Sequence, residues 1–293
     1  MHSGIFLVLF SSILFAFVPN SAKIALDEGS SLFFLVFSRY IIGALILFVF
    51  IAFIRGNLRI PSSVIPYVVL SSTCACILIT LTYHAVDYLD VGLVMLILYC
   101  FPLGVAFISY FRGKSKIVFV QWFSMIVLML GLYLMLSTGE QVLNLYGLFI
   151  SFLGLLFFVA FIVTASDLSE QIGATTFNLY VSIFGIILLT IGFILPLGFE
   201  MHLPLTKTGI FAIFANGFFY ISSWVLFFKG ASIIGATRSS MLACIEPLFA
   251  AILAIILLKQ ILSVTEWIGF FVVLMAIYTF EKNSSKPKTR SPE

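Results

Sequence analysis

The chain has 293 residues, of which 62% are hydrophobic and 9% are charged, and its mean hydropathy is +1.22. A soluble domain usually carries about 25% charged residues, so this composition excludes a large soluble protein and predicts that most of the chain lies in lipid. The net charge of +3 is small. Basic residues gather in short breaks and at the C-terminus, which indicates membrane orientation rather than nucleic-acid binding.

Ten apolar stretches are long enough to cross a membrane as helices, for which about 20 residues are needed. The start of the chain, MHSG, lacks the basic residues of a signal peptide, so we expect the first stretch to be retained as a span. The breaks between stretches are short and are marked by charge, Gly or Pro. The predicted spans are residues 4–26, 31–54, 64–86, 91–111, 117–136, 145–166, 175–195, 206–229, 235–258 and 264–281.

The basic residues also predict the orientation of the chain, because cytoplasmic loops are enriched in Lys and Arg. We therefore expect an integral, multi-pass protein of the plasma membrane (the inner membrane in a bacterium) with both termini in the cytoplasm. This orientation places 11 of the 15 basic residues inside: Arg55, Arg59, Arg112, Lys114, Lys116, Lys229, Arg238, Lys282, Lys286, Lys288 and Arg290.

The two halves of the chain resemble each other at a fixed offset. Pro102 and Pro247 are 145 residues apart, as are Trp122 and Trp267, and the chain has only three tryptophans. Each half holds five spans, so the second half must enter the membrane from the opposite side. We therefore predict an all-α polytopic membrane protein with two inverted five-helix repeats, an arrangement of many secondary transporters. The predicted units are residues 1–138, residues 139–281 and a disordered cytoplasmic tail, 282–293.

Several segments resemble the drug/metabolite transporter superfamily and, within it, the ten-span EamA-type proteins. They are IEPLFAAILAIILLKQILSVTEWIGFFVVLMAIY (245–278), its counterpart FPLGVAFISYFRGKSKIVFVQWFSMIVLMLGLYL (101–134), FSRYIIGALIL (37–47) and FAFVPNSAKIAL (15–26). The resemblance covers nearly the whole chain. It implies metabolite transport and favours export of amino-acid-like compounds or other metabolites, with uptake as the alternative.

Two charged residues are predicted to lie near the middle of the membrane. At 1.5 Å per residue, Glu246 is about 16 Å into span nine and Arg39 is about 12 Å into span two, in a core about 30 Å thick. Ionisable residues at such depth are costly and usually functional. Glu246 and Arg39 are expected to face one central cavity, either paired or each engaging a charged substrate group. The alternative is a structural ion pair that locks two helices.

Two prolines and several polar residues are further candidates for this site. Pro102 and Pro247 interrupt helical hydrogen bonding at equivalent depths, either as simple kinks or to free carbonyl groups and allow bending during gating. The polar residues are expected to line a cavity, and they are equally compatible with contacts between helices. They are Asn216, Tyr220 and Ser223, which follow an i, i+4, i+7 pattern, together with Asn20, Tyr83 and Tyr99.

These features together predict a secondary transporter of a small polar or amphipathic metabolite that works by alternating access. The sequence contains no G-x-S-x-G, H-E-x-x-H or P-loop motif, so we expect neither enzymatic activity nor a cofactor or metal. The energy source is expected to be the solute gradient or an ion, naturally a proton, because a buried carboxylate can bind one. A channel, a non-transporting sensor or scaffold and an intramembrane enzyme remain as alternatives. The expected partners are a small-molecule substrate and the lipid bilayer, without nucleic acid, for a monomer or homodimer.

Overall fold

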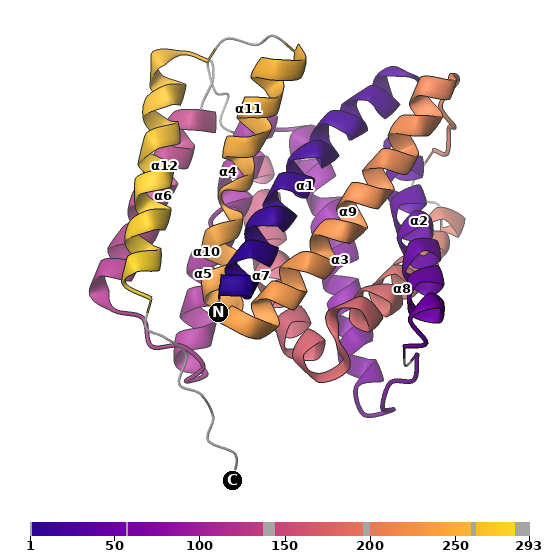
Figure 1. The fold of residues 1–293 in the computed structure, drawn as a ribbon. Coiled ribbons are helices and arrows are strands. Elements are labelled where there is room, and N and C mark those ends of the chain that lie inside the picture. The colour runs from indigo at the N-terminus through magenta and orange to yellow at the C-terminus, as the bar shows by residue number, and fades with distance from the viewer. Residues whose placement is uncertain (1, 57, 137–143, 196–199, 259–261, 285–293) are drawn as a thin grey trace.

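The computed structural model describes residues 2–56, 58–136, 144–195, 200–258 and 262–284, and every element of regular secondary structure in these ranges is an α-helix (Figure 1). Ten helical spans are long and apolar enough to cross a membrane, as predicted. Two of these spans are interrupted. The helices are α1 (His2–Asp27), α2 (Leu32–Phe53), α3 (Ile65–Val86), α4 (Val91–Leu98), α5 (Phe101–Phe111), α6 (Phe119–Leu136), α7 (Leu145–Ile172), α8 (Ala174–Ile194), α9 (Lys207–Ile234), α10 (Ala236–Ala243), α11 (Glu246–Leu258) and α12 (Val264–Lys282).

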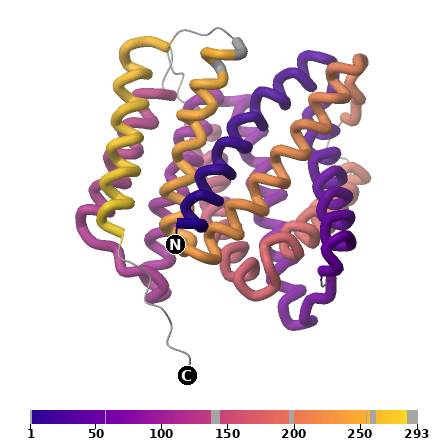
Figure 2. The backbone as a smooth tube through the Cα atoms, viewed as in Figure 1, coloured from indigo at the N-terminus to yellow at the C-terminus, as the bar shows by residue number. Residues whose placement is uncertain are grey.

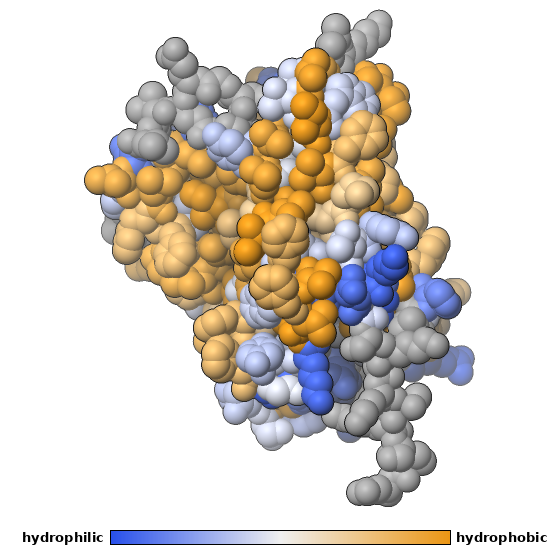
Figure 3. Space-filling model, turned by 90° about the vertical axis from the view of Figure 1, so that its left-hand side faces the viewer, coloured by the Kyte–Doolittle hydropathy of each residue, from blue (hydrophilic) through white to orange (hydrophobic). Residues whose placement is uncertain are grey.

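The outer surface of the bundle is apolar, as lipid requires. Large side chains such as Phe53 and Phe211 are 86% and 74% exposed, which would be unfavourable in water and is favourable against acyl chains. Seen from the side of α6 and α12, hydrophobic residues cover the middle of the molecule, and most of the visible hydrophilic residues gather toward its lower end (Figure 3). Because backbone groups must be satisfied internally in lipid, helices are the expected way to span this layer.

Two helices continue further than the hydropathy of the sequence predicts. The predicted spans end at residues 166 and 229, whereas α7 reaches Ile172 and α9 reaches Ile234. A helix can extend from the lipid into water without interruption, because its backbone hydrogen bonds form equally well in both surroundings. The helices end instead at Gly173 and Gly235, whose φ angles of +83° and +87° suit glycine. The predicted C-terminal tail lies almost entirely outside the described residues.

The two five-span halves are folded onto each other. Helix α1 packs along α9, and α7 packs along α3, which is the equivalent pair when the halves are exchanged (Figures 1 and 2). The same exchange relates the packing of α2 on α9 to that of α8 on α3. Main helix contacts therefore join one half to the other, and the arrangement is that of an inverted repeat, as predicted.

The last spans of the two halves, α6 and α12, pack closely at one edge of the bundle (Figure 2). A Cβ atom added to Gly269 would lie 2.6 Å from the carbonyl oxygen of Gly131 and 2.8 Å from the backbone nitrogen of Met135. Real Cβ atoms do not approach so closely, so this contact depends on glycine. Small residues commonly allow such approach between membrane helices.

Candidate functional site

The two interrupted spans are equivalent in the repeat. Helices α4 and α10 begin at Val91 and Ala236, and helices α5 and α11 begin at Phe101 and Glu246; the members of each pair are 145 residues apart. Between the halves of each span, the backbone forms hydrogen bonds with i to i+3 spacing instead of the α-helical pattern. Both breaks therefore follow from the repeat and lie near the centre of their spans.

Proline explains why each span breaks where it does. Pro102 and Pro247 are buried and are the second residues of α5 and α11. Because proline has no N–H group, the carbonyl groups of Leu98 and Ala243 lose their i+4 donors. The helices are interrupted next to both prolines, and the role of these prolines in bending and gating stays a prediction.

Glu246 lies at one of these breaks, as the first residue of α11. Its side chain is half-buried, and the N-terminal end of a helix favours negative charge. The Tyr99 phenol, which follows α4 at the equivalent break, lies near the Glu246 carboxyl group. The two interruptions thus bring a carboxylate and a phenol together from opposite halves of the chain.

Arg39 belongs to a second polar group. Its side chain is only 6% exposed, and its Nε donates a hydrogen bond of 2.9 Å to Oδ1 of Asn216. The Asn216 amide in turn donates to the carbonyl of Val18 at 2.8 Å and to the hydroxyl of Ser21 at 3.1 Å. This network links α2, α9 and α1 through one fully buried asparagine.

The ring of Tyr220 covers the guanidinium group of Arg39 and packs against further aromatic rings. The Cζ of Arg39 lies 4.5 Å from the ring centroid of Tyr220, a cation–π distance. Tyr220 meets Tyr40 edge-on at 6.4 Å and Trp224 at 6.2 Å, and Trp224 meets Phe15 at 5.0 Å. The half-buried Tyr220 and Trp224 therefore form an aromatic wall in front of a buried positive charge.

Glu246 and Arg39 are not joined by an ion pair in the part of the chain that the structure describes. Glu246 faces Tyr99, and Arg39 faces Asn216 and Tyr220. Of the arrangements considered from the sequence, a pair that locks two helices is therefore not formed. Whether the two residues face one cavity stays a prediction.

The remaining predicted site residues lie elsewhere. The Asn20 amide donates to the carbonyl of Ala16 in its own helix, at 3.1 Å. Half-buried Tyr83 packs against the main apolar core. Ser223 is buried and donates to the carbonyl of Phe219, one turn earlier in the same helix. The structure therefore places none of the three in either polar group.

Sequence reasoning missed three members of the site. Trp224 belongs to the aromatic wall, Tyr40 packs edge-on against Tyr220, and Ser21 is a partner of Asn216. Trp224 follows Tyr220 by four residues, so helical spacing predicts that both share a face. Nothing in the spacing around Tyr40 or Ser21 distinguishes them from residues that pack against a neighbouring helix.

Comparison with known proteins identifies the family. The sequence pattern of the EamA-like transporter family matches residues 2–137 and matches again over residues 145–280. The chain belongs to the EamA-like transporter family. It is therefore a membrane transporter of the drug/metabolite type, as the resemblance predicted, and its substrate is a small molecule. The two matches correspond to the two five-span halves.

Two further similarities concern a curated relative and a solved fold. An uncharacterized inner membrane transporter, YicL of Salmonella typhimurium (strain LT2), is 33% identical over 61 residues, which cover 21% of this chain and 20% of that relative. The match thus spans a fifth of YicL. A solved crystal structure has a similar fold, with a TM-score of 0.79 at 13% identity over 95% of this chain and 98% of the other.

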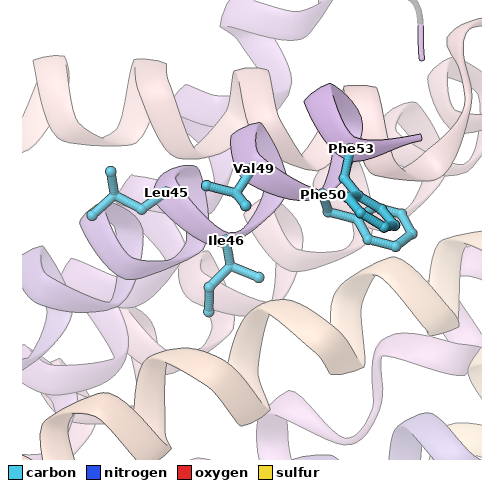
Figure 4. Close-up of a pocket in the computed structure, with 5 residues that line it drawn as sticks. All are labelled: Leu45, Ile46, Val49, Phe50 and Phe53. Carbon is cyan, nitrogen blue, oxygen red and sulfur yellow. The ribbon is translucent and has the colours of Figure 1, made fainter. Parts of the chain in front are cut away.

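This EamA-like transporter also has apolar grooves on its α2 surface. One groove of about 480 Å³ is lined by Leu45, Ile46, Val49, Phe50 and Phe53 (Figure 4). A second groove of about 320 Å³ lies between α2 and α9. Neither is lined by a charged or polar side chain, so both suit lipid rather than a polar solute.

Proposed function

We propose that this EamA-like transporter moves a small amphipathic metabolite with the chemistry of an amino acid, by alternating access and without ATP. One observation carries the proposal: a half-buried carboxylate, Glu246, lies at the interruption of a membrane span. Charge at that depth opposes insertion, so a residue that merely fills space there would be apolar. A cationic amine is the substrate group that this carboxylate would bind.

The equivalent break in the first half of the chain, between α4 and α5, suits the opposite end of such a substrate. The first turn of α5 carries no acidic residue, so the partial positive charge of its N-terminal end is available to a substrate carboxylate. Helix N-terminal ends at broken spans recognise carboxylates in other transporters. The aromatic wall of Tyr220 and Trp224 would pack against the apolar part of the substrate.

Arg39 has a supporting role in this proposal. Because it is almost fully buried behind Tyr220, it acts as a positioning residue that fixes Tyr220 and Asn216. The direct substrate contact considered from the sequence is the less favoured role. Pro102 and Pro247 would let the two interrupted spans bend as the site changes its access from one side to the other.

A proton is the proposed coupling ion, and export from the cytoplasm is the proposed direction. A proton and the substrate amine would compete for the one carboxylate of Glu246, so binding of one displaces the other. The proton gradient would then drive the substrate outward. In sealed vesicles, an imposed pH gradient should accelerate transport without ATP.

The test is Glu246→Gln, which keeps the shape of the side chain and removes its charge. Purified protein is first screened by thermal shift against amino acids and their decarboxylated amines, and transport of the best stabilising compound is then measured in sealed vesicles. We expect at least a tenfold loss of transport, about 1.4 kcal/mol, with a normal amount of folded protein. The matched control is Glu170→Gln, because Glu170 is exposed at the end of α7. Full activity of Glu246→Gln would contradict the proposal.

A further inference from the structure

The packing of the two halves is not fully symmetric. Helix α5 packs against α10, and α7 packs against α9 and α10. Exchange of the halves relates these pairs to α11 with α4, and to α1 with α3 and α4, and these show no comparable packing among the described residues. The first set lies on the side of the membrane where α1 begins and α12 ends, called here the terminal side. The helices are thus closed together on the terminal side and apart on the other.

Buried hydroxyl groups collect where the helices are closed. Ser166 and Ser169 of α7 and Thr237, Ser239 and Ser240 of α10 are between 0% and 7% exposed. None of their hydroxyls has a hydrogen-bond partner within the described part of the chain. Such groups are costly in a native interior and need an explanation.

Most other buried serines in the described part of the bundle are satisfied, although Ser11 of α1 also lacks a partner, so the unpaired hydroxyls are concentrated on α7 and α10. The hydroxyl of Ser72 in α3 donates to the carbonyl of Val68 at 2.8 Å, and that of Ser151 in α7 donates to the carbonyl of Gly147 at 2.8 Å. Close packing of small residues alone would allow the same local bonds on α7 and α10. Unpaired hydroxyls instead suit a surface that is hydrated in another conformation.

Two sets of ion pairs lie at the terminal ends of the same helices. Asp167 of α7 accepts from Arg112 at 2.7 Å and from Lys114 at 2.5 Å, which ties the segment after α5 to α7. Arg238 of α10 binds both carboxylate oxygens of Glu281 in α12, with its Nε at 2.8 Å. These pairs join α5 to α7 and α10 to α12 across the closed end.

We propose that the seam between α5, α7 and α10 is the closed route of the substrate to the terminal side, lined by these hydroxyls and held shut by Asp167 and by the Arg238–Glu281 pair. The inference rests on the proposed alternating access. Helices α5 and α10 each adjoin a central break, so each can tilt without unfolding the other helix of its span, α4 or α11. On opening, water and substrate supply the hydrogen bonds that the hydroxyls lack.

The experiment measures access to the seam by thiol labelling. Ser240→Cys is placed in a background in which Cys74, Cys76, Cys100 and Cys244 are replaced, and the protein in lipid nanodiscs is treated with a charged maleimide. Adding Asp167→Asn should raise the labelling rate at position 240 at least fivefold. The control is Ser72→Cys, which is equally buried and whose rate should change by less than twofold. An unchanged rate at position 240, or an equal rise at position 72, would overturn the proposal.

Charge reversal gives a second, independent measurement. Arg238→Glu should raise the labelling rate at Ser240→Cys, because two carboxylates then face each other. Adding Glu281→Arg should return the rate to within twofold of the starting value, which a general loss of structure would not do. A rate that stays high in the double variant contradicts the role of this pair.

The outcome can be separated from that of the proposed substrate site, because labelling needs no substrate. A rise at position 240 combined with a fully active Glu246→Gln variant would support the closed route and overturn the site. No rise, combined with an inactive Glu246→Gln variant, would support the site and overturn the route.

Discussion

Replacement of Asn216 by Ala should destabilise the protein by about 3 kcal/mol. The side chain accepts a hydrogen bond from the charged Arg39 and donates to Val18 and Ser21, so it joins three helices. A bond to a charged group contributes about 1.5–3 kcal/mol, and each neutral bond within a membrane contributes about 0.6 kcal/mol. The loss also leaves the buried Nε of Arg39 without its acceptor.

The control for this variant is Asn178→Ala, which removes the same atoms from an equally buried position. Asn178 is 3% exposed and Asn216 is 0% exposed, but the Asn178 amide donates only to Ala174 in its own helix, at 2.8 Å. We expect it to lose about 0.6 kcal/mol. Free energies of unfolding would be measured by titration with SDS in mixed micelles, followed by circular dichroism. Equal losses in the two variants would refute the reasoning, because the network would then add nothing to burial.

Three further predictions concern packing, the site and orientation. Gly269→Ala should destabilise the α6–α12 contact by about 1–3 kcal/mol, measured by thermal unfolding. The control is Gly154→Ala, which should be neutral or slightly stabilising, because the nearest neighbours of the added Cβ would lie 3.7 Å away. Similar melting temperatures for the two variants would contradict this prediction. Tyr99→Phe removes the hydroxyl beside Glu246 and should raise KM about tenfold at normal expression, so an unchanged KM in vesicles would exclude a role for that hydroxyl. A reporter active only in the cytoplasm should work at the C-terminus and be silent in the loop 87–90, and the reverse pattern would contradict the predicted orientation.

The spans could be predicted because lipid leaves few alternatives. A backbone in hydrocarbon must form helices, and the thickness of that layer fixes their length. All ten spans were therefore found, including those that the structure divides at Pro102 and Pro247. The ends of α7 and α9 were placed too early because hydropathy reports where lipid ends, whereas the positive φ of Gly173 and Gly235 decides where the helix ends.

The sequence predicts how deep the candidate site residues lie in the membrane, but not which neighbouring residues their side chains contact. Counting residues along a span places Arg39 and Glu246 near the midplane, and helical spacing groups Asn216 with Tyr220. Which residues meet across the bundle depends on how each helix is rotated about its own axis, and that rotation is set by packing over the whole chain. For this reason the sequence is compatible with a pair of Arg39 and Glu246, whereas the structure gives each residue a different partner.

The two breaks share a backbone form and differ in chemistry, which has a consequence for how such a chain can diversify. Two copies of a single five-helix protein, assembled in opposite orientations, would carry the same residue at both breaks. Any ionisable residue at one break would then also be present at the other. Here one position holds Phe101 and the equivalent position holds Glu246. With both halves on one chain, a mutation changes one break alone. The number of charges at the membrane centre can therefore change one at a time, while the duplicated framework around them stays the same.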